Sequence, residues 1–175
     1  MTLPKGTAVI ALATMAAVTI TASVVSGHKA AVQQSWASPP ADAPTIVGVW
    51  RTRVRPRNCE TGEVAPVSGL RGLFTFHEGG TASEYGIGPG QTPALRSPGH
   101  GLWRREPGWQ EYRYAFTYYR YDASGAFVGS QRVTSALVLD ASGDAFTSNS
   151  DVEVFDASDT LIMTVCATAA GTRFE

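Results

Sequence analysis

The sequence predicts an all-β fold, an eight-stranded antiparallel up-and-down barrel preceded by an export signal. Three observations carry this prediction. One long stretch has an aromatic residue at every second position, three Asp-Ala-Ser turns recur at near-regular spacing, and no 3.6-residue apolar period is sustained after residue 45. Asp and Ser bond to the backbone of their own turn and Gly adopts positive φ, so such turns indicate hairpins.

The clearest strand is the segment 109–121, WQEYRYAFTYYRY. Tyr112, Tyr114, Phe116 and Tyr118 occupy alternate positions, and successive side chains of a strand point to opposite faces. We expect a central strand whose ring face is turned toward the core. The other strands are expected, in chain order, at residues 46–55, 70–77, 81–85, 102–106, 126–139, 145–155 and 160–174.

The turns also predict how the strands pair. Four-residue turns at 122–125 and 156–159 place these residues opposite one another: Tyr114 and Val133, Phe116 and Gln131, Val154 and Leu161, Val152 and Met163. These pairings keep one apolar face continuous. A Gly- and Pro-rich loop is expected at residues 86–100, between the third and fourth strands.

Two features favour pairing of the first strand with the last. A register that brings Cys59 beside Cys166 also brings Trp50 within two positions of Arg173. Pairing of these strands closes a barrel and removes its exposed edges. By parity, the cysteines would lie outside the barrel, and Trp50 and Arg173 inside at its floor. An open meander or a sandwich is the alternative.

The start of the chain has the pattern of a secretory signal peptide: Lys5, a weakly apolar run at residues 8–25, and then small residues. We interpret residues 1–37 as signal and leader, 38–44 as a Pro-rich linker, and 45–175 as one β-barrel domain. The expected location is secreted, periplasmic or in the cell envelope. The alternative is an uncleaved anchor, because the run approaches the ~20 residues that span a bilayer.

Composition limits the classes of partner and cofactor that we expect. The formal net charge of -1 gives no strong field for nucleic acid, so no nucleic-acid partner is expected, nor stable membrane insertion after signal cleavage. Cys59 and Cys166 in an exported chain favour a disulfide over a metal pair. We expect no metal and no cofactor, since His77 and His100 are the only histidines after the linker. The sequence indicates no particular oligomeric state.

The triplet Gly48-Val49-Trp50, together with Arg173 near the end of the last strand, resembles the lipocalin and wider calycin pattern. The resemblance implies that Trp50 packs at the closed end of the barrel and that Arg173 covers it. The Thr-Asp-Tyr motif of lipocalins is missing at the turn after the expected sixth strand. The stretches PRNCETG, FTFHEGGT and RSPGHGLW also resemble a group of small exported bacterial proteins.

The segment 96–101, RSPGHG, is the most notable polar cluster, and we expect it in a loop at the barrel mouth. Arg96 could clamp a carboxylate or phosphate of a ligand, and His100 could move a proton near neutral pH. The alternative is that Pro and Gly shape a tight connection while Arg96 and His100 bond to nearby carbonyls or carboxylates.

The interior is expected to hold the ring row and several apolar side chains. As ligand-binding candidates we name Tyr112, Tyr114, Phe116, Tyr118 and Gln131, with Phe74, Phe76, Val133, Met163 and Val165 beside them. They would line an apolar cavity in which phenol groups orient a ligand. Alternatively they fill the barrel, because side chains can fill an eight-stranded interior.

Four arginines form a one-sided row, Arg51, Arg53, Arg55 and Arg57. They could face an anionic surface, but we expect them to pair with carboxylates on neighbouring strands, such as Glu153 or Glu84.

The expected function is binding of a small apolar or amphipathic molecule by a secreted barrel. The chain contains none of the sequence motifs for a nucleophile elbow, a phosphate-binding loop or a zinc protease, so no catalytic residue is named and an enzyme is not favoured. Two alternatives stay open: a barrel enzyme of isomerase or cyclase type, and a filled barrel that serves as an envelope interaction module.

Overall fold

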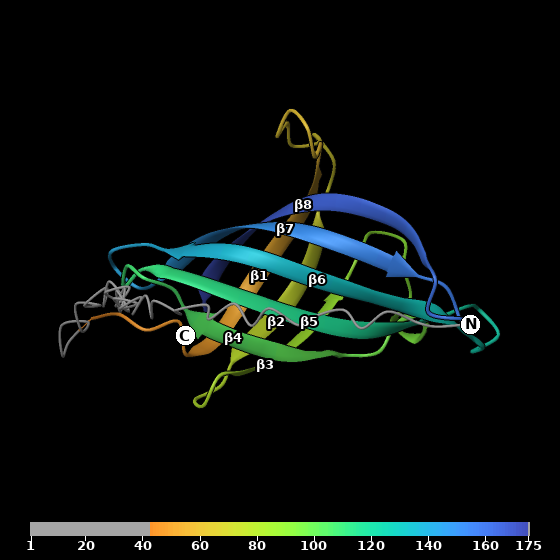
Figure 1. Ribbon diagram of the computed structural model, residues 1–175, viewed down its shortest axis with the longest axis horizontal. Helices are drawn as coiled ribbons and strands as arrows, with labels where there is room; N and C mark the ends of the chain where they lie inside the picture. The colour runs from red at the N-terminus through yellow and green to blue at the C-terminus, as the bar shows by residue number, and fades with distance from the viewer. Residues whose placement is uncertain (1–42, 175) are drawn as a thin grey trace, which may run out of the picture. The chain divides into compact units, whose positions relative to one another are not determined.

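Eight antiparallel strands form a closed barrel in the computed structural model, which describes residues 43–174 (Figure 1). Each strand pairs with the next, and the last returns to the first. The strands are β1 Gly48–Arg57, β2 Leu70–Phe76, β3 Thr81–Ile87, β4 Gly99–Arg105, β5 Glu111–Tyr121, β6 Phe127–Leu139, β7 Ala145–Phe155 and β8 Leu161–Arg173, with a single 3-10 turn, η1, at Pro93–Leu95. The predicted all-β class and barrel closure are confirmed.

The predicted signal and leader (1–37) and most of the linker (38–44) lie outside the described residues. Within residues 43–174, no helix has the length and apolar character needed to cross a membrane.

One predicted strand boundary differs from the structure by more than two residues. The fourth strand begins at Gly99, not at residue 102, so His100 belongs to β4 and not to a loop. Its two glycines suggested a loop, but they allow close strand packing. A Cβ at Gly101 would lie 1.9 Å from the Ala115 backbone oxygen, and one at Gly99 would lie 2.7 Å from the Phe116 ring. These glycines allow β4 and β5 to approach closely. A single sequence cannot distinguish this role of glycine from its role in turns.

The predicted hairpin registers are also wrong, by two positions. Phe116 pairs with Val133 and Tyr114 with Ser135, while Val154 pairs with Met163 and Val152 with Val165. The turn residues Gly125 and Asp159 have positive φ, and each hairpin has a register irregularity beside its turn, at Arg120/Tyr121 and at Val154/Phe155. Bulges add residues to one strand. Because the shift is even, the paired side chains between each irregularity and the floor keep their predicted faces.

Pairing between β1 and β8 matches the prediction closely. Trp50 pairs with Arg173, and Cys59 forms a disulfide with Cys166 just beyond the paired residues. Trp50 is completely buried, and the Arg173 guanidinium lies 4.3 Å from its ring. Arg173 also donates hydrogen bonds to the carbonyls of Thr45, Val47 and Gly143, which ties three segments together at the floor.

The floor half of the barrel is filled with side chains. Phe76 lies among Trp103, Tyr114 and Phe146, with ring centroids 5.6 to 6.3 Å apart. The Trp50 indole donates to the Ile46 carbonyl at 2.9 Å, so its one polar atom is satisfied. The buried core consists mainly of Ile46, Trp50, Phe74, Phe76, Tyr112, Leu137, Leu139 and Phe146. This packing closes the barrel at the Trp50 end.

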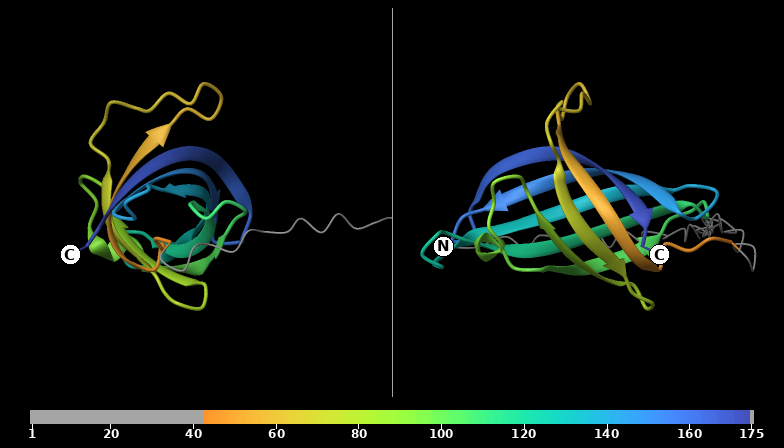
Figure 2. Two further views of the ribbon diagram at one scale, coloured as in Figure 1. Left: turned by 90° about the vertical axis from the view of Figure 1, so that its left-hand side faces the viewer. Right: turned by 180° about the vertical axis from the view of Figure 1, so that it is seen from behind.

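The opposite end, the mouth, is more open. The β1–β2 loop, residues 58–69, stands away from the barrel in both views of Figure 2. β1 ends at Arg57, opposite Cys166, so the start of β8 pairs with β7 and lies beyond the end of β1. Met163 faces the interior by parity but is half exposed. Its predicted interior burial is therefore wrong, because no part of β1 covers it.

Candidate functional site

A cavity of about 650 Å³ occupies the mouth half of the barrel. Its walls come from every strand except β4 and from the two long loops. Its apolar lining includes Val54, Leu70, Phe74, Ile87, Leu95, Phe116, Val133, Val152, Val165, Ala167 and Ala169. The interior is thus packed at the floor and open toward the mouth.

The ring row of β5 is divided by this boundary. Tyr114, Phe116 and Tyr118 line the cavity, and their neighbouring rings stack with centroids 6.2 and 6.3 Å apart. Tyr112 lies in the filled floor instead, only 1% exposed, and its hydroxyl accepts a hydrogen bond of 2.7 Å from Arg105 Nη2. Of the five predicted ligand contacts in the interior, the structure brings four to the cavity, Gln131 included, and leaves Tyr112 outside it.

A buried ion pair, Glu84 with Arg96, forms the polar centre of the cavity. Both side chains are more than nine-tenths buried, and Arg96 Nη2 donates to Glu84 Oε2. Arg96 Nη1 also donates to the Gly86 carbonyl at 2.9 Å, and Nε to the Ser97 carbonyl at 3.3 Å. The loop after η1 carries Arg96 back into the barrel. There its guanidinium is bonded to a carboxylate and to carbonyls of the same chain, which was the expected alternative to clamping a ligand.

Burial raises the pKa of Glu84 above its ordinary value, although the charge and hydrogen bond of Arg96 act in the opposite direction. Burial and the Arg96 guanidinium thus act on the Glu84 pKa in opposite directions. Loss of water penalises the carboxylate, and the adjacent guanidinium stabilises it. The proton affinity of Glu84 is therefore raised by its burial and moderated by Arg96.

Tyr118 connects this ion pair to the neighbouring strand β6. The Arg96 guanidinium lies 3.6 Å from the centre of the Tyr118 ring, and the Tyr118 hydroxyl donates to Gln131 Oε1. A guanidinium over a ring face is held by the ring's quadrupole. Burial raises the pKa of the Tyr118 hydroxyl, so it stays a neutral donor at ordinary pH.

A small polar layer separates the cavity from the packed floor. Ser135 and Ser150 share a hydrogen bond of 2.6 Å, and Tyr114 and Ser148 share one of 3.1 Å. All four side chains are buried. Burial raises the pKa of Tyr114, which keeps its hydroxyl protonated within this network.

Arg120 is a cavity residue that the sequence reasoning missed. It follows Tyr118 by two positions, so it shares the inward face of β5, and it lines the cavity beside Tyr121. Within residues 43–174, its Nη1 is buried and has no hydrogen-bond partner. The alternation that identified the ring row was the available signal. The row simply continues from phenols to a guanidinium at the mouth.

His100 does not reach the cavity. It lies on the exposed outer face of β4, between Ser83 of β3 and Thr117 of β5. Its expected place in a mouth loop beside Arg96 is wrong, because strand parity turns its ring outward.

The arginine row of β1 lies outside the barrel, as parity predicts, but its expected partners are wrong. Glu84 points inward and pairs with Arg96, and Glu153 lies 3.7 Å from Arg132. Within residues 43–174, no ion pair involves Arg51, Arg53 or Arg55.

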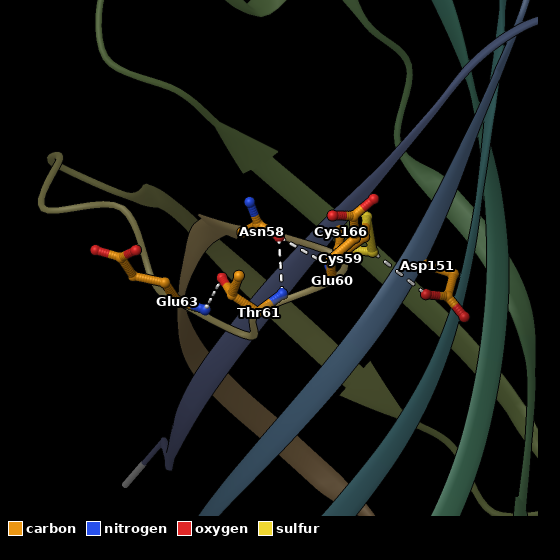
Figure 3. The surroundings of a disulfide bond; sticks show 7 residues. All are labelled: Asn58, Cys59, Glu60, Thr61, Glu63, Asp151 and Cys166. Carbon is orange, nitrogen blue, oxygen red and sulfur yellow. Dashed lines mark hydrogen bonds between the residues drawn. A yellow bond between two sulfur atoms is a disulfide. The ribbon is translucent and has the colours of Figure 1, made fainter.

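The disulfide anchors one loop of the cavity mouth (Figure 3). Asn58 Oδ1 accepts hydrogen bonds from the backbone of Glu60 and Thr61 at 2.8 and 2.9 Å, which shapes the chain around Cys59. On the other side, Asp151 Oδ1 lies 3.6 Å from the Cys166 sulfur. Val67 and Ser68 of the same loop line the cavity.

Among residues 43–174, no three His, Cys, Asp or Glu side chains are grouped so that they could hold a metal ion. No model of a known protein family matches this chain, and no curated protein matches it either. The closed eight-stranded barrel is consistent with a calycin-like fold, so the resemblance rests on architecture.

Proposed function

We propose that this protein is an exported β-barrel that binds a small apolar or amphipathic molecule in the mouth half of its interior. The observation that carries the proposal is the cavity of about 650 Å³, with apolar walls and a few polar groups at defined positions. Binding pockets for small molecules have volumes of roughly 300–1,000 Å³ and this same mixture of linings. The disulfide is compatible with an oxidising compartment outside the cytoplasm.

The polar groups favour an amphipathic ligand with an anionic head. Arg96 is neutralised by Glu84, whereas Arg120 brings a second guanidinium to the mouth and has one buried nitrogen without an acceptor among residues 43–174. A carboxylate is the planar acceptor that a guanidinium binds best. The apolar tail would then lie deeper, against Phe116 and Val133.

The test is calorimetric titration with dodecanoate and with dodecanol, which share a tail and differ in the charge of the head. Ala167 lines the cavity, whereas Ala170 is exposed on the outer face of the same strand. We expect Ala167→Phe to weaken binding of both ligands about tenfold or more, because the ring occupies their space, and Ala170→Phe to leave it unchanged.

The same titration tests the head group. Arg120→Gln should weaken dodecanoate binding about tenfold and leave dodecanol binding nearly unchanged, whereas the outward Arg113→Gln should change neither. Failure of the folded wild type to bind either ligand would refute the cavity proposal. Equal loss for both ligands in Arg120→Gln would refute only the role of Arg120.

One observation favours a second candidate, a barrel enzyme of isomerase or cyclase type. Glu84 is a carboxyl with a raised pKa facing a cavity, and catalytic acids and bases are often held in this way. Turnover of a bound unsaturated substrate that is lost in a folded Glu84→Gln variant would support this candidate. The cavity in the mouth half favours ligand binding over the third expectation, a filled barrel that serves as an envelope interaction module.

A further inference from the structure

A second concave feature lies on the outside of the barrel, across β8, β1, β2 and β3. This outer groove has a volume of about 720 Å³ and is lined by Arg51, Arg53, Arg71, Leu73 and Tyr85, among others. Gly72 and Gly86, a cross-strand pair, also line it. β1 and β2 lie at the front of the right-hand view of Figure 2.

The groove concentrates positive charge that no ion pair among residues 43–174 neutralises. Arg51, Arg53 and Arg71 are all exposed, and no ion pair among residues 43–174 includes any of them. The outward positions of β1, β2, β3 and β8 carry no Asp or Glu at all, since Glu84 of β3 points inward. This segregation occurs in a protein whose formal net charge is -1.

Two of these arginines are direct neighbours. Arg53 pairs with Arg71 across β1 and β2, and like charges placed directly opposite destabilise a sheet. The chain contains an internal comparison, because Arg104 and Arg113 are also cross-strand partners. There, Glu106 Oε1 lies 2.7 Å from Arg104 and 3.6 Å from Arg113, so a carboxylate of the same chain compensates the pair. In the part of the chain that the structure describes, no carboxylate compensates the Arg53–Arg71 pair in this way.

The groove also presents apolar and aromatic surface beside the charges. Leu73 is half exposed and pairs with both Arg51 and Tyr85, which is itself 37% exposed. The Arg51 guanidinium lies 4.8 Å from the ring of Phe174. Flat rings and guanidinium groups together can contact the rings of a sugar or another cyclic unit and its charged substituents.

We propose that the outer groove binds a linear polyanion, such as a sulfated or carboxylated polysaccharide, whose charges lie between Arg53 and Arg71. The spacing favours a repeating chain. Arg51 and Arg53 share one face of β1, so their backbones are about 6.7 Å apart along the strand, and Arg55 continues the row. A concave groove fits a chain better than it fits a flat lipid surface. Thr52 and Ile87 contribute to both the groove and the cavity, but Arg51, Arg53 and Arg71 line the groove alone. The groove proposal can therefore hold when the proposed ligand does not bind in the cavity.

The experiment measures binding of a heparin dodecasaccharide by calorimetry in low and moderate salt. The double variant Arg53→Gln/Arg71→Gln should weaken binding about tenfold or more, and added salt should weaken wild-type binding, because the contacts are between exposed charges. The matched control is Arg104→Gln/Arg113→Gln, which removes the same charge from the compensated pair and should leave binding within about twofold.

Unfolding of the same variants gives a second readout. Arg53→Gln/Arg71→Gln should be as stable as the wild type or more stable, because it relieves like-charge repulsion, so lost binding cannot be attributed to lost folding. Equal weakening by both double variants, or no heparin binding by the wild type at low salt, would overturn the proposal. Titration with short-chain polyphosphate under the same conditions distinguishes a preference for phosphate polymers from a preference for sulfate polymers. Stronger binding to phosphatidylglycerol vesicles, lost in the same variant, would overturn the polymer in favour of a lipid surface.

Discussion

Glu84 shows how much the surroundings of one residue can change its chemistry. On sequence alone it is a strand residue that could face either side. In the barrel it is 7% exposed, and among residues 43–174 its carboxylate forms an ion pair with Arg96 alone. Replacing one partner of a buried ion pair leaves the other charge uncompensated, so Glu84 and Arg96 are expected to depend on each other for stability.

The pH dependence of stability follows from the direction of the Glu84 pKa shift. Because its folded-state pKa is raised above the ordinary value of 4.5, the contribution of Glu84 to stability is fully present below pH 4.5 and is lost as pH rises through the folded-state pKa. The difference in unfolding free energy between wild type and Glu84→Gln should therefore be more favourable to the wild type near pH 4 than near pH 7.

Urea unfolding at a series of pH values measures this difference. Glu111→Gln, which changes an exposed carboxyl at the start of β5, is the matched control and should run parallel to the wild type. A difference that grows in favour of the wild type as pH rises would contradict the assigned direction.

At the scale of elements, the hairpins differ from expectation where bulges occur. The β5–β6 hairpin reaches its register through an irregularity at Arg120/Tyr121, opposite Gly129 and Phe127. Gly129 has φ +131°, and a Cβ there would lie 2.0 Å from the Phe155 carbonyl oxygen of β7. The bulge therefore depends on glycine for its backbone conformation and for its close packing against a third strand.

Gly129→Ala should lower the free energy of unfolding by about 2 kcal/mol or more, because it combines an unfavourable φ with a clash against backbone. Gly125→Ala separates the two causes. Gly125 has φ +85° and open space around it, so its variant should lose only about 1 kcal/mol. Denaturant unfolding of both variants measures the difference. Equal losses would show that the close approach to Phe155 contributes little.

At the scale of the whole molecule, the disulfide links two residues that are far apart in the sequence. It joins residues 107 positions apart and links the loop after β1 to β8 near the end of their pairing. A crosslink of this span restricts the unfolded chain strongly, which stabilises the fold by about 4.7 kcal/mol in the chain-entropy description. The Arg173 hydrogen bonds fasten the same two strands at the opposite, floor end.

The variant Cys59→Ser/Cys166→Ser should lose about 4 kcal/mol of unfolding free energy, measured by denaturant titration. The wild type treated with dithiothreitol should unfold at the same denaturant concentration as the double variant, and the untreated double variant should not respond to reductant. Identical stability of the oxidised wild type and the double variant would rule out a stabilising crosslink.

Alternation and turn chemistry determine much of this protein from the sequence. The ring row of β5, the inward Trp50 and the disulfide partners follow from local patterns and parity, because a strand has only two faces. The same parity contains the information that Arg120 points inward and His100 outward. It failed for His100 because the glycines beside it suggested a loop.

The sequence by itself determined the all-β class, the number of strands, barrel closure, and the faces on which Trp50, the arginine row of β1 and the ring row of β5 lie. Only the tertiary structure decided where the interior is filled and where it is open, since that depends on how side chains from eight strands divide one volume. It also decided that Arg96 folds back onto Glu84, because the path of a long loop is set by contacts with distant strands. The uncompensated Arg53–Arg71 pair likewise emerged only when the register placed two separate strands side by side.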